Sequence, residues 1–263
     1  MLEPTTCAAV IPSFNESASI TTLVRAVRQH VPAVLVVDDG STDDTALRAK
    51  NAGAGVLKHE RNLGKGAALK TGLSRALKQG YEWAVTLDGD GQHAPEDFPA
   101  LLSCAEQTGA LLVIGNRMNE AQKMSWLRRQ VNRWMSRKLS QRAGRPLPDT
   151  QSGFRLIHLR TWAALSLNTE HFEVESEMLL AFLAAEHPVA FVPIQVICRS
   201  RSSHICPVMD SLRWWKWWRG LERGVHAASS FKVHRPNVSS LSARTLKRPE
   251  GRAPGTVSRC APN

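Results

Sequence analysis

The sequence predicts an α/β protein with a mostly parallel, Rossmann-like sheet and helices on both of its faces. Short apolar runs alternate with amphipathic stretches along about the first 200 residues. This alternation is typical of strand–helix–strand units with right-handed crossovers. Several apolar runs end in acidic or basic side chains. Because parallel strands bring their carboxyl ends to one edge of the sheet, we expect these polar ends to meet there and to form a ligand site.

The apolar periodicity sets the order of the elements. We expect strands at residues 7–11, 34–37, 55–58, 83–87, 111–114 and 189–198. Pro193 places the last of these at an edge or a bulge. We expect helices that begin at Ser17 and after Ser41 or Thr42, and helices over residues 67–79, 94–107, 123–142, 172–185 and 207–226. A polar turn at residues 146–155 leads into the segment 154–159.

The composition limits the classes of protein that the chain can form. Its 263 residues are 43% hydrophobic, which suffices for one large domain or two small ones. The formal net charge of +11 favours anionic partners such as nucleotide phosphates, anionic lipid or nucleic acid. Five scattered cysteines without a Cys-x-x-Cys pair disfavour a zinc site and a disulfide framework. We see neither a signal peptide nor an apolar run of about 18 residues, so we expect no spanning helix.

Two carboxylates follow the strand expected at residues 83–87. Asp88 and Asp90 are separated by one glycine, and Gln92 adds an amide oxygen. Oxygen ligands at this spacing suit Mg²⁺ or Mn²⁺, and such an ion keeps open positions for phosphate oxygens. An isolated Asp-x-Asp is also common in plain turns, so the flanking segments decide its weight.

Other strand ends carry polar groups as well. Residues 12–16 follow the first strand, Asp38 and Asp39 the second, and Arg117 the fifth. Lys65, between two glycines, opens a helix whose N-terminus can attract an anion, although the spacing matches neither a dinucleotide fingerprint nor a Walker loop. We interpret other acids at helix starts as complements of the helix dipole: Asp43, Asp44, Glu173, Glu175 and Glu177.

Two helices combine arginine with tryptophan. In residues 123–142 most arginines are expected to be solvated, while one or two near the site can bind a phosphate. In residues 207–226 one face suits a membrane interface, with packing on the domain as the alternative; it carries Trp214, Trp217, Trp218, Leu221 and Val225. We divide the chain into a main domain (1–200), a basic Trp-rich interfacial helix (201–230) and a disordered basic tail (231–263).

A series of motifs resembles family 2 glycosyltransferases, in the branch typified by dolichyl-phosphate mannose synthases and bacterial polyprenyl-phosphate glycosyltransferases. The motifs are VIPSFNE (10–16), VVDDGSTDDT (36–45), NLGKGAALKTG (62–72), LDGDGQH (87–93), GNR (115–117) and DTQSGFR (149–155). The resemblance implies an A-type glycosyltransferase fold for residues 1–200. It also implies a metal-dependent, inverting transfer from a nucleotide-sugar donor to a polyprenyl phosphate acceptor.

The resemblance also assigns residues to the donor and the metal ion. The expected nucleotide-sugar contacts are Pro12, Phe14, Glu16, Asp39, Lys65, Asp88, Asp90 and Gln92. Asp90 and Gln92 would be direct ligands of Mg²⁺ or Mn²⁺, with Asp88 beside the metal-bound diphosphate. Phe14 stands where the family usually has tyrosine, so the ring is kept and the hydroxyl is lost.

For the acceptor, the resemblance assigns Arg117, and less firmly Arg128, to the phosphate, and it places Asp149 by the reacting sugar. The resemblance also places Arg155 near the same edge of the sheet. Arg201 falls where the family carries basic groups. A glycan or lipid hydroxyl as acceptor would instead need Asp149 as a general base.

The expected setting is cytoplasmic, with peripheral contact on the inner face of the plasma membrane and no specific nucleic acid partner. A basic nucleic-acid-binding protein is the alternative of another class, since the charge alone would allow it. The acidic residues at the strand ends argue against that alternative.

Overall fold

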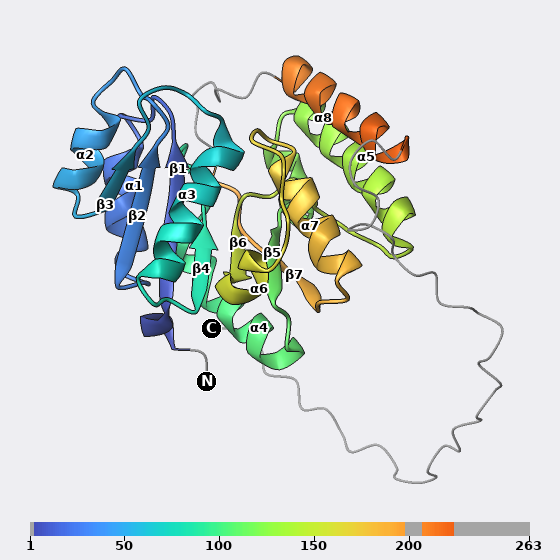
Figure 1. Ribbon diagram of the computed structural model, residues 1–263, viewed down its shortest axis with the longest axis horizontal. Coiled ribbons are helices and arrows are strands. Elements are labelled where there is room, and N and C mark those ends of the chain that lie inside the picture. The colour runs from blue at the N-terminus through green and yellow to red at the C-terminus, as the bar shows by residue number, and fades with distance from the viewer. Residues whose placement is uncertain (1–2, 198–206, 224–263) are drawn as a thin grey trace, which may run out of the picture.

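The computed structural model describes residues 3–197 and 207–223, which form a layered α/β structure (Figure 1). Its sheet has seven strands in the order β3-β2-β1-β4-β6-β5-β7. The strands are β1 (Cys7–Ser13), β2 (Ala33–Asp38), β3 (Gly55–Lys58), β4 (Trp83–Thr86), β5 (Leu112–Asn116), β6 (Arg155–His158) and β7 (Val189–Pro193). All pairings are parallel except those of β6, which runs antiparallel to both β4 and β5. The predicted mostly parallel sheet is therefore confirmed.

The strand β6 decides how the site is assembled. It comes from the segment that follows the polar turn, and it inserts between β4 and β5. Because β6 opposes both neighbours, β4 and β5 run in the same direction. The carboxyl ends of β1, β2, β4 and β5 therefore lie at one rim of the sheet, and the amino end of β6 joins them.

Helices cover both faces of the sheet (Figure 1). One core cluster packs α1 (Ile20–Val27), α2 (Thr45–Asn51) and α4 (Phe98–Thr108) on one face. The other cluster packs α3 (Lys65–Lys78), α5 (Trp126–Ala143), α6 (Leu159–Ala163), α7 (Val174–Ala184) and α8 (Pro207–Glu222). Short 3-10 helices lie at Pro4–Thr6, Pro95–Asp97 and Met118–Lys123.

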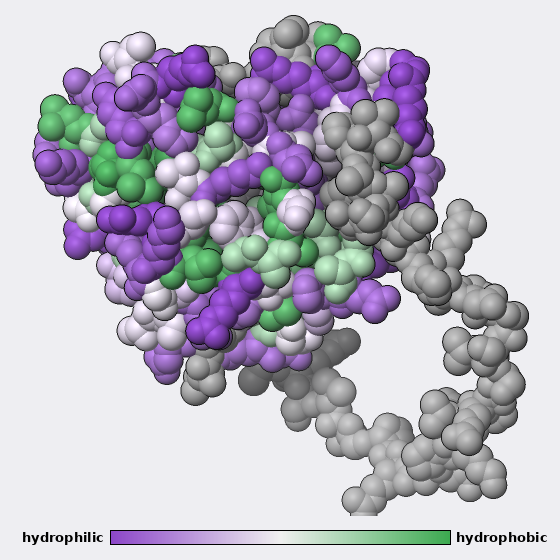
Figure 2. All heavy atoms as spheres, in the orientation of Figure 1, coloured by the Kyte–Doolittle hydropathy of each residue, from purple (hydrophilic) through white to green (hydrophobic). Residues whose placement is uncertain are grey.

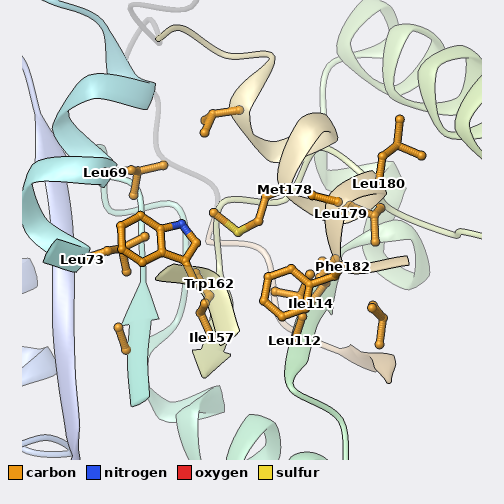
Figure 3. Packing of buried hydrophobic residues seen from close by; sticks show 14 of the residues in the cluster. Leu69, Leu73, Leu112, Ile114, Ile157, Trp162, Met178, Leu179, Leu180 and Phe182 are labelled. Atoms are coloured by element: carbon orange, nitrogen blue, oxygen red, sulfur yellow. The ribbon is translucent and has the colours of Figure 1, made fainter. Parts of the chain in front are cut away.

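Strand alternation explains how one sheet serves two cores. In β1, Ala8 and Val10 belong to the cluster of α3 and α7, whereas Cys7, Ala9 and Ile11 belong to the cluster of α1 and α4. Figure 3 shows the cluster that contains α3 and α7: side chains from α3, α6, α7 and the central strands lie close together. Both faces of the sheet are covered, which fits the nearly continuous apolar runs in the sequence.

The Trp-rich helix packs on the domain, which corrects our interpretation of its apolar face. Trp214, Trp217, Trp218 and Leu221 are buried in the core cluster that includes α7. The Trp214 indole nitrogen donates to Ser176 Oγ at 2.9 Å, and its ring lies 5.2 Å from that of Trp134 on α5. The large area of tryptophan favours burial wherever a protein surface is available. Arg201, Val225 and residues 231–263 lie outside the described residues.

Several local expectations need correction. The first helix begins at Ile20, not Ser17, and the second begins at Thr45, so Ser41 does not cap it. The Ser41 hydroxyl instead accepts a hydrogen bond from the Asn15 amide. Asp43 accepts from the amides of Thr45 and Ser17, so it joins two loops as well as standing at a helix start. The last strand is shorter than expected and lies at the sheet edge, as Pro193 predicted.

No helix within residues 3–197 and 207–223 combines the length and the apolarity that crossing a bilayer requires.

Candidate active site

Asp39 holds the loop that leads into α3. Its Oδ1 accepts hydrogen bonds from the Leu63 amide (3.0 Å) and from His59 Nδ1 (2.7 Å), and its Oδ2 accepts from the Gly64 amide (2.8 Å). Gly64 has a φ of 100°, a conformation that glycine adopts without strain. Asp39 therefore fixes the backbone immediately before Lys65. The neighbouring Asp38 is buried and its Oδ2 has no partner among the described residues.

Lys65 links this loop to the Asp88–Asp90 turn. Its ammonium group lies 2.6 Å from Asp88 Oδ1 and 2.5 Å from Glu175 Oε1 on α7. Burial by itself lowers the pKa of Lys65, but the two carboxylates outweigh it and raise the pKa. Lys65 therefore stays charged in the rim.

The contacts of Glu175 correct our view of it as a dipole complement. Glu175 is 4% exposed, and its carboxylate pairs with Lys65, which lies 110 residues earlier in the chain. Glu177 needs the same correction, because it accepts hydrogen bonds from the backbone amides of Asn168 and Thr169. Glu175 therefore joins distant segments of the chain, whereas Glu177 fixes the loop that precedes its own helix.

The three residues expected to hold a metal ion lie in the turn that follows β4; they are Asp88, Asp90 and Gln92. Burial alone would raise the pKa of Asp88, but Lys65 and His93 hold it well below its usual range. Asp90 Oδ1 accepts a hydrogen bond from the backbone amide of Gln92. The side-chain oxygen Oε1 of Gln92 accepts one from Arg128 at 2.7 Å. Their oxygens therefore gather within reach of the cationic groups of the rim.

This oxygen set fits a divalent cation that binds through substrate phosphates. Within the described ranges no group of three or more His, Cys, Asp and Glu side chains could hold a metal ion by itself. Mg²⁺ is typically bound by one or two carboxylates, with waters and phosphate oxygens completing its octahedron. Two aspartates and one amide oxygen match that demand and lack the full protein cage that would suit Zn²⁺ or Ca²⁺.

Arg117 and Asp149 form a buried ion pair at the end of β5. The Arg117 Nε and Nη2 atoms donate to the two carboxylate oxygens of Asp149 at 2.8 and 2.9 Å, and the Arg117 amide donates to Oδ2 at 3.1 Å. Asp149 is 0% exposed. Burial alone would raise its pKa, but Arg117 overrides this and lowers it. Asp149 thus fixes Arg117, whose Nη1 donates to no group in the described ranges.

Arg128 brings a second guanidinium to the rim from the first turn of α5. It is partly buried, and its bond to Gln92 directs it to the Asp88–Asp90 turn. Burial and then the charge of Arg117 lower its pKa, and Asp90 and Asp88 act in the opposite direction. Two neighbouring arginines that repel one another form a site that an anion would stabilise.

Arg155 lies at the rim, as expected, but its side chain forms hydrogen bonds with the protein backbone. Its guanidinium donates to the carbonyl oxygens of Thr150, Ser152 and Glu175. Burial is the main cause that lowers its pKa to about 10. Arg155 therefore ties the Asp149 loop to α7.

Pro12, Phe14 and Glu16 lie at the carboxyl end of β1. Pro12 is buried within the strand, whereas Phe14 and Glu16 are partly exposed beyond it. Glu16 accepts from the Ser19 hydroxyl, which also lies 2.8 Å from the carbonyl oxygen of Gly89. The end of β1 therefore adjoins the Asp88–Asp90 turn, and the proposed contacts of these three residues with a nucleotide stay predictions.

Sequence reasoning missed Gly153 and Glu175 as site residues. A Cβ atom on Gly153 would lie 2.5 Å from Asp88 Oδ1, so the backbone must approach this carboxylate closely. Gly153 lies in a quoted motif, which was an available signal. For Glu175 no local pattern distinguishes an acid that complements a dipole from one that meets a distant lysine.

The fold is that of an A-type glycosyltransferase, and its rim carries acidic strand ends with arginines beside them. The description "Glycosyl transferase family 2" belongs to a family model that matches residues 8–161, more than half of the chain. The chain belongs to glycosyltransferase family 2.

Relatives with assigned activities are similar over most of their length. The chain is 30% identical over 211 residues to the UDP-N-acetylglucosamine--dolichyl-phosphate N-acetylglucosaminyltransferase of Methanococcus voltae, covering 72% of this chain and 84% of the relative. It is 32% identical over 207 residues to the undecaprenyl-phosphate mannosyltransferase of Micrococcus luteus, covering 70% and 82%.

A solved structure shows the same fold. Glucosyl-3-phosphoglycerate synthase from Mycobacterium tuberculosis, in complex with Mn²⁺, UDP and phosphoglyceric acid, aligns with a TM-score of 0.62 at 22% identity. The alignment covers 80% of this chain and 74% of that one.

Proposed function

We propose that the protein transfers a sugar, with inversion, from a nucleotide-sugar donor to a polyprenyl phosphate at the cytoplasmic face of the plasma membrane. The main structural support for this proposal is the pair of arginines, Arg117 and Arg128, beside the Asp88–Asp90 turn. The names of the two relatives, which specify dolichyl and undecaprenyl phosphates, support this acceptor class.

The chemistry asks little of a general base. A phosphate oxygen of the acceptor attacks the anomeric carbon, the bond from that carbon to the diphosphate oxygen breaks, and its electron pair leaves with the nucleoside diphosphate. Because the acceptor is already an anion, positioning by Arg117 and Arg128 suffices. Asp149 is a poor base, since its pKa is lowered and both of its oxygens accept from Arg117.

The donor is assigned to the opposite part of the rim. Pro12, Phe14 and Glu16 would line the nucleoside, and Asp39 would contact its base or ribose. Lys65, at the N-terminus of α3, would face the diphosphate with its positive charge.

Asp88, Asp90 and Gln92 would hold the Mg²⁺ or Mn²⁺ ion. A divalent ion held there would supply positive charge opposite the leaving diphosphate. Lys65 and Arg128, which now contact two of these three side chains, would be redirected to phosphate oxygens. This exchange keeps the rim close to charge balance before and after the donor binds.

The test begins with the donor. The purified protein is heated with each of a panel of nucleotide sugars, with Mn²⁺, Mg²⁺ or chelator, and the donor is recognised by a metal-dependent rise in Tm. That donor is then offered with a polyprenyl phosphate. Asp90→Asn should lower transfer by about 10²–10³-fold, as loss of one electrostatic stabiliser does in other enzymes.

Glu82→Gln is the isosteric control, because Glu82 is exposed and directly precedes β4, at the opposite end of that strand from the Asp88–Asp90 turn. It should transfer at the wild-type rate. Transfer to a glycan or lipid hydroxyl, with no product on polyprenyl phosphate, would refute the proposed acceptor. Absence of metal-dependent stabilisation by every nucleotide sugar would refute the proposed donor.

A further inference from the structure

The helices α5 and α8 expose apolar side chains on one side of the molecule. Seven large hydrophobic residues are exposed among the described residues, and five of them lie on these two helices. The five are Trp126, Leu127, Trp134, Leu212 and Trp215, and we call them the α5–α8 outer face. Single exposed apolar residues are ordinary on a protein surface, but a group concentrated on adjacent helices marks an interaction site.

The two helices lie side by side (Figure 1). The Trp134 ring of α5 meets the buried Trp214 ring of α8 edge to face. Trp214 and its buried neighbours hold α8 against the domain, so the opposite side of the same helix is left facing outward. Helical spacing then places Leu212 and Trp215 on that outward side. The outer face is therefore rigidly attached to the domain.

Basic residues surround these apolar side chains. α5 contains no acidic residue, and its exposed Arg133 and Arg137 lie on the same side as Trp126. On α8, Lys216 and Arg219 are exposed, and the Arg219 guanidinium lies 4.6 Å from the centre of the Trp215 ring. In Figure 2 the part of the surface over α5 and α8 is mainly hydrophilic, with an apolar side chain at its edge.

This mixture of aromatic and basic side chains fits a lipid bilayer better than a protein partner. Tryptophan and leucine enter the boundary between headgroups and acyl chains, while arginine and lysine attract anionic headgroups. A protein partner that buried the same surface would have to compensate each desolvated arginine with an acid. A bilayer leaves the guanidinium groups hydrated at the headgroup level, so the mixture of basic and aromatic residues fits it better.

We propose that the α5–α8 outer face docks on an anionic lipid bilayer and presents the rim to lipid-linked phosphates. The connection to the rim is short. Trp126 and Leu127 begin α5, and Arg128 follows them and donates to Gln92 Oε1 at 2.7 Å. The same helical turn thus offers apolar side chains to the membrane and a guanidinium to the site. The inference rests on the proposed function for its lipid acceptor, but docking is measurable without any transfer.

The test is sedimentation of the full chain with vesicles that contain no polyprenyl phosphate. Phosphatidylcholine vesicles with added phosphatidylglycerol should bind the protein, and phosphatidylcholine alone should bind it weakly. The double variant Trp126→Ser/Trp215→Ser should lose about tenfold or more in partition onto the anionic vesicles, because binding scales with the apolar area inserted. Leu47→Ser is the control, since Leu47 is 58% exposed on α2 and lies outside the outer face.

A second measurement separates docking from transfer. With a short, water-soluble prenyl phosphate as acceptor, the double variant should match the wild type, whereas transfer to acceptor embedded in vesicles should fall with the loss of binding. An unchanged Tm shows that the variant is folded.

Unchanged vesicle binding by the folded double variant would overturn the inference. A dimer that the double variant converts to a monomer, with vesicle binding unchanged, would also overturn it and would assign the face to a second copy of the chain. Failure of the proposed function looks different, because vesicles would still bind while no polyprenyl phosphate is glycosylated.

Discussion

The buried pair of Arg117 and Asp149 makes a quantitative prediction for Asp149→Asn. The substitution keeps the shape of the side chain but removes the charge that compensates the guanidinium of Arg117, a residue that is only 4% exposed. Breaking a buried pair on one side costs about 3–5 kcal/mol, because the remaining charge stays desolvated. For a chain of this size that corresponds to a fall in Tm of roughly 6–20 °C.

The assay is thermal unfolding followed by far-ultraviolet circular dichroism, with Asp44→Asn as the isosteric control on an exposed site. The double variant Arg117→Met/Asp149→Leu should recover much of the lost stability, because no buried charge is then left unpaired. If Asp149→Asn keeps its Tm within about 2 °C, which corresponds to less than about 1 kcal/mol, and transfer nevertheless collapses, our reasoning is wrong. Asp149 would then act on the substrate directly.

The pH dependence of the same variant gives an independent check. The pKa of Asp149 is lowered from its usual 3.8 by Arg117, despite burial. A carboxylate whose pKa is lower in the folded state stabilises that state fully at pH values above its unfolded-state pKa. This stabilisation is lost as the pH falls through its folded-state pKa. The stability difference between wild type and Asp149→Asn should therefore stay constant from pH 8 to about 5 and narrow only below about 4. A difference that fades near neutral pH would indicate a raised pKa and a base.

Three further variants test other contacts of the rim and the core. Glu175→Gln leaves Lys65 with one carboxylate, and KM for the donor should rise about tenfold, or about 1.4 kcal/mol, with a smaller change in kcat; an unchanged KM would contradict the role given to Glu175. Gly153→Ala places a methyl group 2.5 Å from the present position of Asp88 Oδ1, so the metal concentration for half-maximal activity should rise about 10–100-fold while the fold is kept. Trp214→Ala should cost about 3–5 kcal/mol in unfolding experiments, and a loss below about 1 kcal/mol would mean that α8 is not part of the core.

Much of the fold was predictable because it depends on local patterns. Apolar runs of strand length, separated by amphipathic stretches, indicate alternating strands and helices, and alternation of this kind leads to parallel pairing. The motif residues Asp39, Asp88 and Arg117 each follow such a run within three residues. Their convergence at one rim is a consequence of strand direction, so it could be expected before any coordinates.

Contacts between distant residues were not predictable in the same way. Nothing in the sequence near Glu175 distinguishes a carboxylate that complements the helix dipole from one that pairs with Lys65. In the same way, Asp149 could be assigned to the sugar by motif, but only the fold shows both of its oxygens bound to Arg117. Such pairings depend on which strand enters between which neighbours, and a single chain carries no local record of that choice.

The amino-acid sequence by itself determined the layered α/β architecture, the family and the segments that carry the site, because periodicity and motifs are properties of short stretches. Tertiary structure alone decided that β6 enters antiparallel between β4 and β5, that Lys65 bridges Asp88 and Glu175, and which side of α8 is buried. Helical periodicity tells which residues share a face, but a tryptophan-rich face gains from any apolar surroundings. Only the position of α8 relative to α5 and α7 determines whether protein or lipid supplies them.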